Sequence, residues 1–196
     1  MNAAFEKALA FTGKWEGDFT NDPRDRGGAT RHGVSLRFLK GAPGEEGDID
    51  GDGEITLKDV LGLTRDEAAE LFKRHFWTPL SLDQVPEALA MVVFDAAVNM
   101  GVSASAVMLQ QSLNALFPDE PALATDGVAG PRTLARLEKA LAAPDGEERL
   151  IRETLSRRAA MYLSLGRKEQ YAWAVGGWMN RTRDLWDKTA GTPCPF

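Results

Sequence analysis

One apolar segment, residues 87–98, constrains the fold more than any other feature of the sequence. It reads E-A-L-A-M-V-V-F-D-A-A-V and is apolar nearly all the way round a helix. A helix of this composition has no face for water, so other helices must surround it. Its apolar run from Ala88 to Val98 is too short to cross a bilayer and contains Asp95. We therefore predict a mainly α chain with this helix buried at its centre and no integral membrane segment.

Capping and periodicity signals predict further helices on both sides of this segment. The expected starts, in chain order, are Asn2, Thr64, Ser103, Pro131 and Asp145. A last helix is expected to carry Tyr171, Val175, Trp178 and Trp186. Residues 17–60 are rich in Gly, Asp and Pro and predict one loop-rich lobe with a short hairpin.

Composition excludes several classes of protein. Cys194 is the only cysteine, so neither an internal disulfide nor a cysteine-rich zinc cluster can form. The two histidines do not form an H-E-x-x-H motif. A net charge of −6 argues against nucleic-acid binding. No signal peptide is recognisable, which predicts synthesis in the cytoplasm; if the protein acts outside, another route must release it.

The first candidate for chemistry is the segment from Glu16 to Ser35, E-G-D-F-T-N-D-P-R-D-R-G-G-A-T-R-H-G-V-S. Glu16 is expected at the end of the first helix, and Asp25 and Thr30 follow in a loop. Glycoside hydrolysis needs a protonated carboxyl as general acid and commonly a second, ionised carboxylate. Taken singly, a Glu at a helix end is most often a surface group, and an Asp beside Gly or Pro is most often a turn former.

This segment resembles the signature of glycoside hydrolase family 108, which contains phage endolysins and secretion-activator muramidases. The family motif reads approximately E-G-G-Y-x-N-D-P-x-D-x-G-G-x-T-x-x-G-I-T. The resemblance implies that Glu16 is the catalytic acid and that Asp25 and Thr30 are its partners. We take Asn21, Asp22 and Asn99 as candidates for substrate binding.

The resemblance continues through the rest of the chain. Residues 94–101, F-D-A-A-V-N-M-G, resemble the family's buried helix, and D-G-V-A-G-P-R-T at 126–133 and G-W-M-N-R at 177–181 resemble its second half. That half is described as a predicted peptidoglycan domain. The implied fold is lysozyme-like, with a catalytic part at 1–86 and a helical peptidoglycan part at 87–196, packed as one globular unit. Asp95 and Asn99 share a helix face and are expected to tie the buried helix to the loop-rich lobe.

A second motif lies in an insert at about residues 41–60. D-I-D-G-D-G-E-I-T-L-K-D at 48–59 has the spacing of a twelve-residue EF-hand loop, with Gly53 at the turn position. Its expected ligands are Asp48, Asp50, Asp52, Glu54 through its carbonyl, Thr56 and Asp59. The motif predicts one structural Ca²⁺ ion, and we expect no cofactor for catalysis.

The resemblance implies an endolysin-type muramidase that cuts the β-1,4 bond between N-acetylmuramic acid and N-acetylglucosamine. It also implies a monomer that is made in the bacterial cytoplasm and reaches the cell wall by a holin-like route. The alternative is a non-catalytic, calcium-stabilised module that binds peptidoglycan or assists secretion. A zinc amidase or a cysteine peptidase fits poorly, because both would depend on Cys194 near the chain end. The five tryptophans suit sugar-binding surfaces, although any single one is more often core filler.

Overall fold

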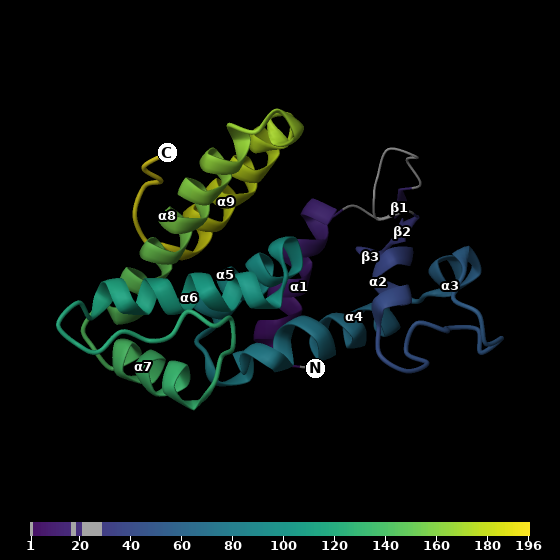
Figure 1. Ribbon diagram of the computed structural model, residues 1–196, viewed down its shortest axis with the longest axis horizontal. Helices are drawn as coiled ribbons and strands as arrows, with labels where there is room; N and C mark the ends of the chain where they lie inside the picture. The colour runs from purple at the N-terminus through teal and green to yellow at the C-terminus, as the bar shows by residue number, and fades with distance from the viewer. Residues whose placement is uncertain (1, 17–18, 21–28) are drawn as a thin grey trace. The chain divides into compact units, whose positions relative to one another are not determined.

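The computed structural model describes residues 2–16, 19–20 and 29–196. In these ranges the chain forms α-helices, short 3₁₀ and π-helical turns and one small antiparallel sheet (Figure 1). The mainly α class predicted from the sequence is confirmed. Among the described helices, none is both long enough and apolar enough to cross a bilayer.

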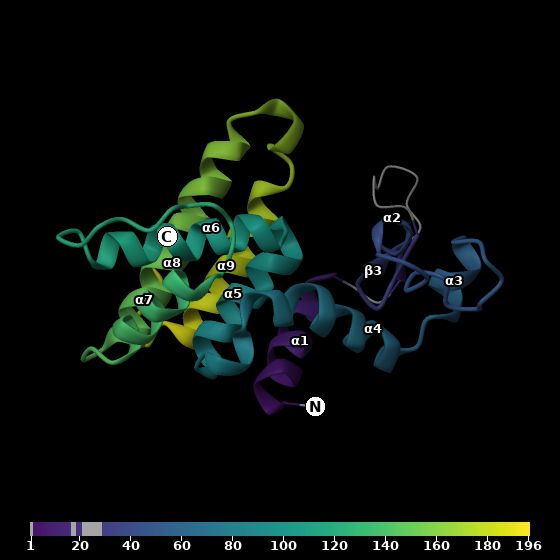
Figure 2. The same cartoon turned by 60° about the horizontal axis from the view of Figure 1, so that its bottom comes forward.

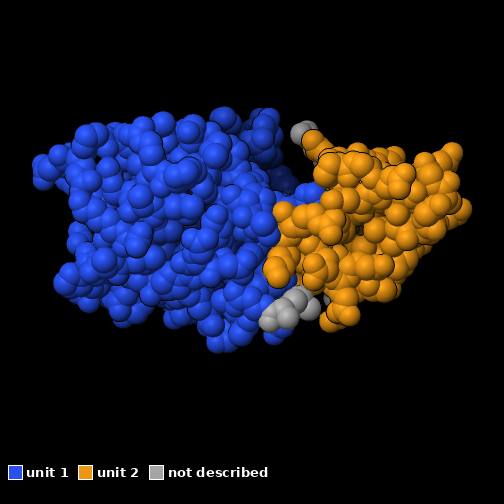
Figure 3. Space-filling model, turned by 90° about the horizontal axis from the view of Figure 1, so that it is seen from below, with its two compact units in different colours: residues 1–8, 75–196 blue, residues 9–74 orange. Residues whose placement is uncertain are grey.

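The chain divides into two compact units, coloured separately in Figure 3. Unit 1 comprises Met1–Ala8 and His75–Phe196, and unit 2 comprises Leu9–Arg74. The chain passes from one unit to the other inside helix α1 (Ala3–Glu16) and again inside the π-helical turn η1 (Lys73–Trp77). This division differs from the functional boundary at residue 86 that the sequence suggested.

Unit 1 is built around α5 (Glu87–Met100), the apolar helix singled out above. It packs against α6 (Val102–Leu116), α8 (Gly146–Gly166) and α9 (Val175–Thr189), as both ribbon views show (Figures 1 and 2). Nearly all of its middle is buried, from Leu89 to Ala97. The prediction of a central buried helix is therefore confirmed.

Aromatic rings pack beside α5 in the same unit. Phe5, Trp77 and Phe94 meet edge to face, with ring centroids 5.3–5.7 Å apart. This geometry matches the quadrupoles of the rings and adds to the area that they bury. Unit 1 also contains α7 and three 3₁₀ turns: α7 (Pro131–Leu141), η2 (Thr78–Leu80), η3 (Leu82–Gln84) and η4 (Glu169–Tyr171).

Unit 2 holds the three-stranded sheet, in the order β1 (Phe19–Thr20), β2 (Thr30–Arg31), β3 (Val34–Ser35). Both strand pairs are antiparallel, so the predicted short hairpin is confirmed. Three helices follow: α2 (Leu36–Gly41), α3 (Leu57–Gly62) and α4 (Arg65–Phe72). The first two lie in the stretch that the sequence predicted as loop.

Local capping rules place most helix starts correctly. The Asn2 side chain accepts from Ala4 N, Thr64 and Glu67 form the predicted capping box, and Pro131 opens α7. The cap predicted at Ser103 is wrong. Gly101, at φ +93°, both ends α5 and caps α6, because a residue without Cβ can turn the chain in one step.

Candidate functional site

The first candidate site is the Glu16–Ser35 segment of unit 2. Glu16 is the last residue of α1, as predicted, and Thr30 is a half-buried residue at the start of β2. Thr30 pairs with Thr20 on β1 and with Ser35 on β3. Asn21, Asp22 and Asp25 lie outside the described residues. The structure therefore places Glu16 at the C-terminal end of α1 and Thr30 on the central strand of the sheet.

A strained turn joins β2 to β3. Arg31 pairs with Val34, and the two residues between them, His32 and Gly33, have φ of 51° and 80°. Positive φ at both positions is the two-residue hairpin turn that matches the twist of paired strands. A non-glycine residue pays for this conformation, and such strain gathers near functional sites. The turn at His32 was not predicted from the sequence. The dipeptide His32-Gly33 between two short strands could have indicated it, because Gly favours the positive φ of such turns.

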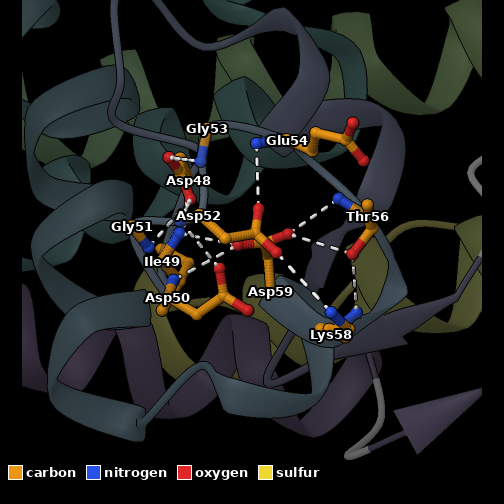
Figure 4. Close-up of polar contacts among 10 residues, drawn as sticks. All are labelled: Asp48, Ile49, Asp50, Gly51, Asp52, Gly53, Glu54, Thr56, Lys58 and Asp59. Atoms are coloured by element: carbon orange, nitrogen blue, oxygen red, sulfur yellow. Dashed lines mark hydrogen bonds and ion pairs between the residues drawn. The ribbon is translucent and has the colours of Figure 1, made fainter.

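The second candidate site is the acidic loop between α2 and α3, shown in Figure 4. The Asp48 carboxylate accepts from the backbone N–H groups of Gly51, Asp52 and Gly53 at 2.9–3.1 Å. Gly51 and Gly53 adopt φ of 74° and 86°, in the left-handed region that favours glycine. The loop is thus curled around its first aspartate, and the EF-hand assignment stays a prediction.

Three aspartates converge in this loop. Asp48, Asp50 and Asp52 each place a carboxylate oxygen within 4.8 Å of the others. Asp50 Oδ1 accepts from Asp52 N at 3.2 Å, and Asp52 Oδ1 accepts from Glu54 N at 2.9 Å. Like charges held this close repel one another, and a hard cation that prefers oxygen ligands relieves the repulsion. The donor set present therefore fits Ca²⁺.

Asp59 plays a different part from the other aspartates. Its buried carboxylate accepts from the N–H groups of Ile49, Asp50 and Thr56, at 2.8, 3.3 and 2.7 Å. Burial raises the pKa of Asp59, but these hydrogen bonds lower it more, so the net pKa lies below its usual value. Asp59 also forms a capping box with Thr56, the N-cap of α3. It fastens both ends of the loop to the start of α3.

Tight backbone packing holds the start of the loop. A Cβ on Gly47 would lie 2.2 Å from the carbonyl oxygen of Leu39 in α2 and 2.9 Å from Ile55 Cδ1. Only glycine allows this approach. The loop is consequently pinned to α2 at one end and to α3 at the other.

In unit 1, α5 carries Asp95 and Asn99, the polar pair that shares a helix face. Asp95 is fully buried, and its carboxylate lies 2.6 Å from Arg158 Nη1 on α8 and 2.7 Å from Arg181 Nη2 on α9. Burial raises the pKa of Asp95, but the two guanidinium groups lower it more, to below its usual value. These ion pairs fasten α5 to α8 and α9. The tie to the loop-rich lobe that the sequence suggested stays a prediction.

A hydrogen-bonded chain leads from this cluster to Asn99. Arg158 Nε donates to the Tyr162 hydroxyl at 2.9 Å, and that hydroxyl donates to Asn99 Oδ1. The bond fixes the half-buried Asn99 amide so that its NH₂ group remains available for donation, with no bonding partner among the described residues. The role of Asn99 in substrate binding stays a prediction.

Arg158 and Tyr162 were not recognised from the sequence. The usable signal was helical spacing, because Leu155, Arg158 and Tyr162 lie three and four residues apart and so share a face. All three are buried. A charged residue on a buried face requires a partner of opposite charge, which Asp95 provides.

The segment at 126–133 folds over Gln110, a buried residue of α6. Its Nε2 donates to Asp126 Oδ1 at 2.7 Å and to the Val128 carbonyl at 2.9 Å, and its Oε1 accepts from Gly127 N. The hydrogen bond from Gln110 is the main reason that the pKa of Asp126 lies below its usual value. Beside it lies a hollow of about 190 Å³, bordered by Leu123 and by the start of α7.

Two family models divide the chain. The model described as "Glycosyl hydrolase 108" matches residues 9–101, which include Glu16, Thr30 and the acidic loop. Residues 9–101 are a glycosyl hydrolase 108 domain. The model described as "Predicted Peptidoglycan domain" matches residues 104–183, from α6 into α9. The chain is therefore a glycoside hydrolase that acts on peptidoglycan.

A solved structure shares the fold of the whole chain. The structure of Brucella abortus SagA superposes with a TM-score of 0.73 and 24% sequence identity, over 96% of this chain and 96% of that one. Together with the helices described above, this likeness confirms the predicted lysozyme-like, mainly α fold. No curated protein sequence matches this chain at a significant level.

Proposed function

We propose that this glycosyl hydrolase 108 protein is a muramidase, which hydrolyses the β-1,4 bond between N-acetylmuramic acid and N-acetylglucosamine. One observation carries the proposal: inside the family domain, the glutamate of the family signature, Glu16, is the last residue of α1, and strand β1 of the sheet begins at Phe19. A general acid must give a proton to the leaving glycosidic oxygen, and a glutamate carboxyl is a common group for this step.

Asp25 is proposed as the second carboxylate, with Thr30 as its partner in the reaction. In this scheme Glu16 donates a proton to the leaving glycosidic oxygen. Asp25 either stabilises the positive charge on the sugar or holds the attacking water. Thr30 supports the proposal because its strand position fixes its backbone between Thr20 and Ser35.

The proposal is tested by replacing Glu16 with Gln. The amide keeps the shape of the side chain but has no proton to donate, so wall lysis should fall by about 10²–10⁴. Glu6→Gln is the matched control, because Glu6 is an exposed residue on the same helix. A folded Glu16→Gln protein that lyses walls at the rate of this control would reject the acid assignment.

The alternative, a non-catalytic peptidoglycan-binding or secretion-assisting module, predicts a different result. Such a protein would bind walls without solubilising them, and Glu16→Gln would change nothing. The same pair of variants therefore separates the two functions, provided that binding and release of soluble fragments are measured together.

We further propose that the acidic loop binds one structural Ca²⁺ ion. The side chains of Asp48, Asp50 and Asp52, the carbonyl of Glu54, and Thr56 or a water would supply the ligands. Asp59 accepts hydrogen bonds from loop amides and so holds the loop to α3. Its role as a ligand stays a prediction. Isothermal calorimetry on the intact protein should give one site, and Asp50→Ala should abolish it.

A further inference from the structure

One large aromatic side chain of unit 1 projects into solvent. Trp173 is 85% exposed, the highest value among the large apolar residues that the structure describes. It lies in the connection between α8 and α9, at one end of that helix pair (Figures 1 and 2). An indole this exposed offers a flat apolar face to a partner, and Trp is enriched at interfaces for that reason.

The Trp173 ring is fixed by its own turn. Its Nε1 donates to the carbonyl oxygen of Gln170 at 3.0 Å, and Gln170 belongs to the 3₁₀ turn η4 (Glu169–Tyr171), which comes just before Trp173 in the chain. The only polar atom of the indole is therefore satisfied locally. The faces of the ring remain available for an apolar contact, and little side-chain entropy is left to lose when that contact forms.

A rigid base supports the turn. Tyr171 packs on Trp178 at 6.1 Å, and Trp178 stacks on the buried Tyr162 at 4.9 Å. The two helices meet closely below it, because a Cβ on Gly166 would lie 2.3 Å from Val175 Cγ2. The connection that carries the exposed ring is thus anchored to unit 1 by a stack of aromatic side chains.

Two cations lie in the same connection between α8 and α9 as Trp173. Arg167 and Lys168 are adjacent in this turn, and neither side chain has a bonding partner among the described residues. Only Glu169 opposes them in the turn, whereas the whole chain carries a net charge of −6. A locally positive turn on an acidic protein favours an anionic ligand.

We propose that this tip, defined as Arg167, Lys168 and Trp173, is a contact site for the glycan strands of peptidoglycan. A sugar ring stacks its C–H face on the indole of Trp173, and the two cations meet carboxylates of the peptide stems. The polymer follows from the proposed function and from the peptidoglycan domain at residues 104–183, which contains the tip. A membrane contact is disfavoured, because it buries a broad apolar face and the tip offers a single ring among polar residues.

The test is co-sedimentation with purified, insoluble cell-wall sacculi. The variants are built in the Glu16→Gln background so that the walls are not digested. Trp173→Ala should weaken binding about tenfold, the loss of one aromatic contact. Trp173→Phe should retain most of the affinity, because the flat face remains. Leu163→Ala is the matched control, since Leu163 is also exposed (53%) and lies on α8.

Two further measurements complete the test. Replacing Arg167 and Lys168 with Gln should flatten the dependence of binding on salt. With active enzyme, Trp173→Ala should raise the wall concentration needed for half-maximal lysis and leave the maximal rate unchanged, because stacking holds substrate and transition state equally. The melting temperature should not change.

Three results would overturn the proposal. They are unchanged wall binding by Trp173→Ala, an equal loss in Leu163→Ala, and Trp173-dependent binding to anionic lipid vesicles instead of walls. The outcome is separate from that for the muramidase assignment. If walls yield no new reducing ends while Trp173→Ala still loses binding, the tip proposal stands and the muramidase proposal falls.

Discussion

Arg181 forms an ion pair with Asp95 in the core of unit 1: its Nε lies 3.0 Å from both carboxylate oxygens of Asp95, and its Nη2 lies 2.7 Å from Oδ1. Arg158 approaches the same carboxylate from α8. One carboxylate thus offsets two buried guanidinium groups and joins three helices. A buried ion pair of this kind adds modest net stability, but breaking it leaves uncompensated charge.

Asp95→Asn should therefore destabilise the protein strongly. The amide keeps the shape of the side chain but leaves both guanidinium groups without a counter-charge, at a cost of about 3–5 kcal/mol in the free energy of unfolding. Urea titration measures the loss. Glu153→Gln is the control, because it removes a half-exposed pair with Arg157 that contributes less than about 1 kcal/mol. Equal unfolding midpoints for the two variants would contradict the role of Asp95.

The same cluster predicts a pH dependence. Because the folded-state pKa of Asp95 is lowered, its contribution is fully present above the ordinary aspartate pKa of about 3.9. It is lost as the pH falls from there through the lower, folded-state pKa. The difference in unfolding free energy between the wild type and Asp95→Asn should be constant from pH 7 to 5 and shrink below about pH 4. A difference that grows with acidification would refute this linkage.

The acidic loop separates two roles for its aspartates. Calcium at a hundredfold excess over Kd should stabilise the folded state by about 2.7 kcal/mol, seen as a rise in melting temperature. Asp50→Ala should abolish that rise. Asp59→Asn should lower the melting temperature with and without calcium, because it weakens the bonds to the loop amides. If the wild type shows no rise, the loop is only an acidic turn.

The turn between β2 and β3 predicts a selective tolerance at His32. Asn accepts positive φ readily, so His32→Asn adds no backbone strain. A β-branched residue resists this conformation, and His32→Val should be less stable than His32→Asn by about 1–2 kcal/mol. Thermal unfolding of the two variants checks the difference. Equal melting temperatures for the two variants would contradict the claim that positive φ at position 32 selects the residue.

The sequence predicted correctly those features that depend on residues close together in the chain, namely helix starts and the burial of one helix. The apolar run of α5 required burial on all sides, and the capping box at Thr64 and the proline at Pro131 marked helix starts. The same rules misplaced Tyr171 in the last helix. It belongs to the 3₁₀ turn η4, and α9 begins at Val175.

Long-range pairing explains most of what the sequence could not show. Asp95 and Arg181 are 86 residues apart, and nothing in either local pattern names the other. The position of Asp59 in the sequence was compatible with two roles. Its position in the EF-hand spacing suggested a ligand, while its position three residues after Thr56 equally marked a capping box, and the structure shows the box. The ligand role stays a prediction.

The chemistry of the products released from purified peptidoglycan tests the central claim most directly. A muramidase breaks a glycosidic bond, so digestion by the wild type should create new reducing ends at N-acetylmuramic acid and no new free amines. Glu16→Gln should release neither, while Glu6→Gln should match the wild type. New amines without reducing ends, or no release of fragments by a folded wild-type protein, would contradict the account.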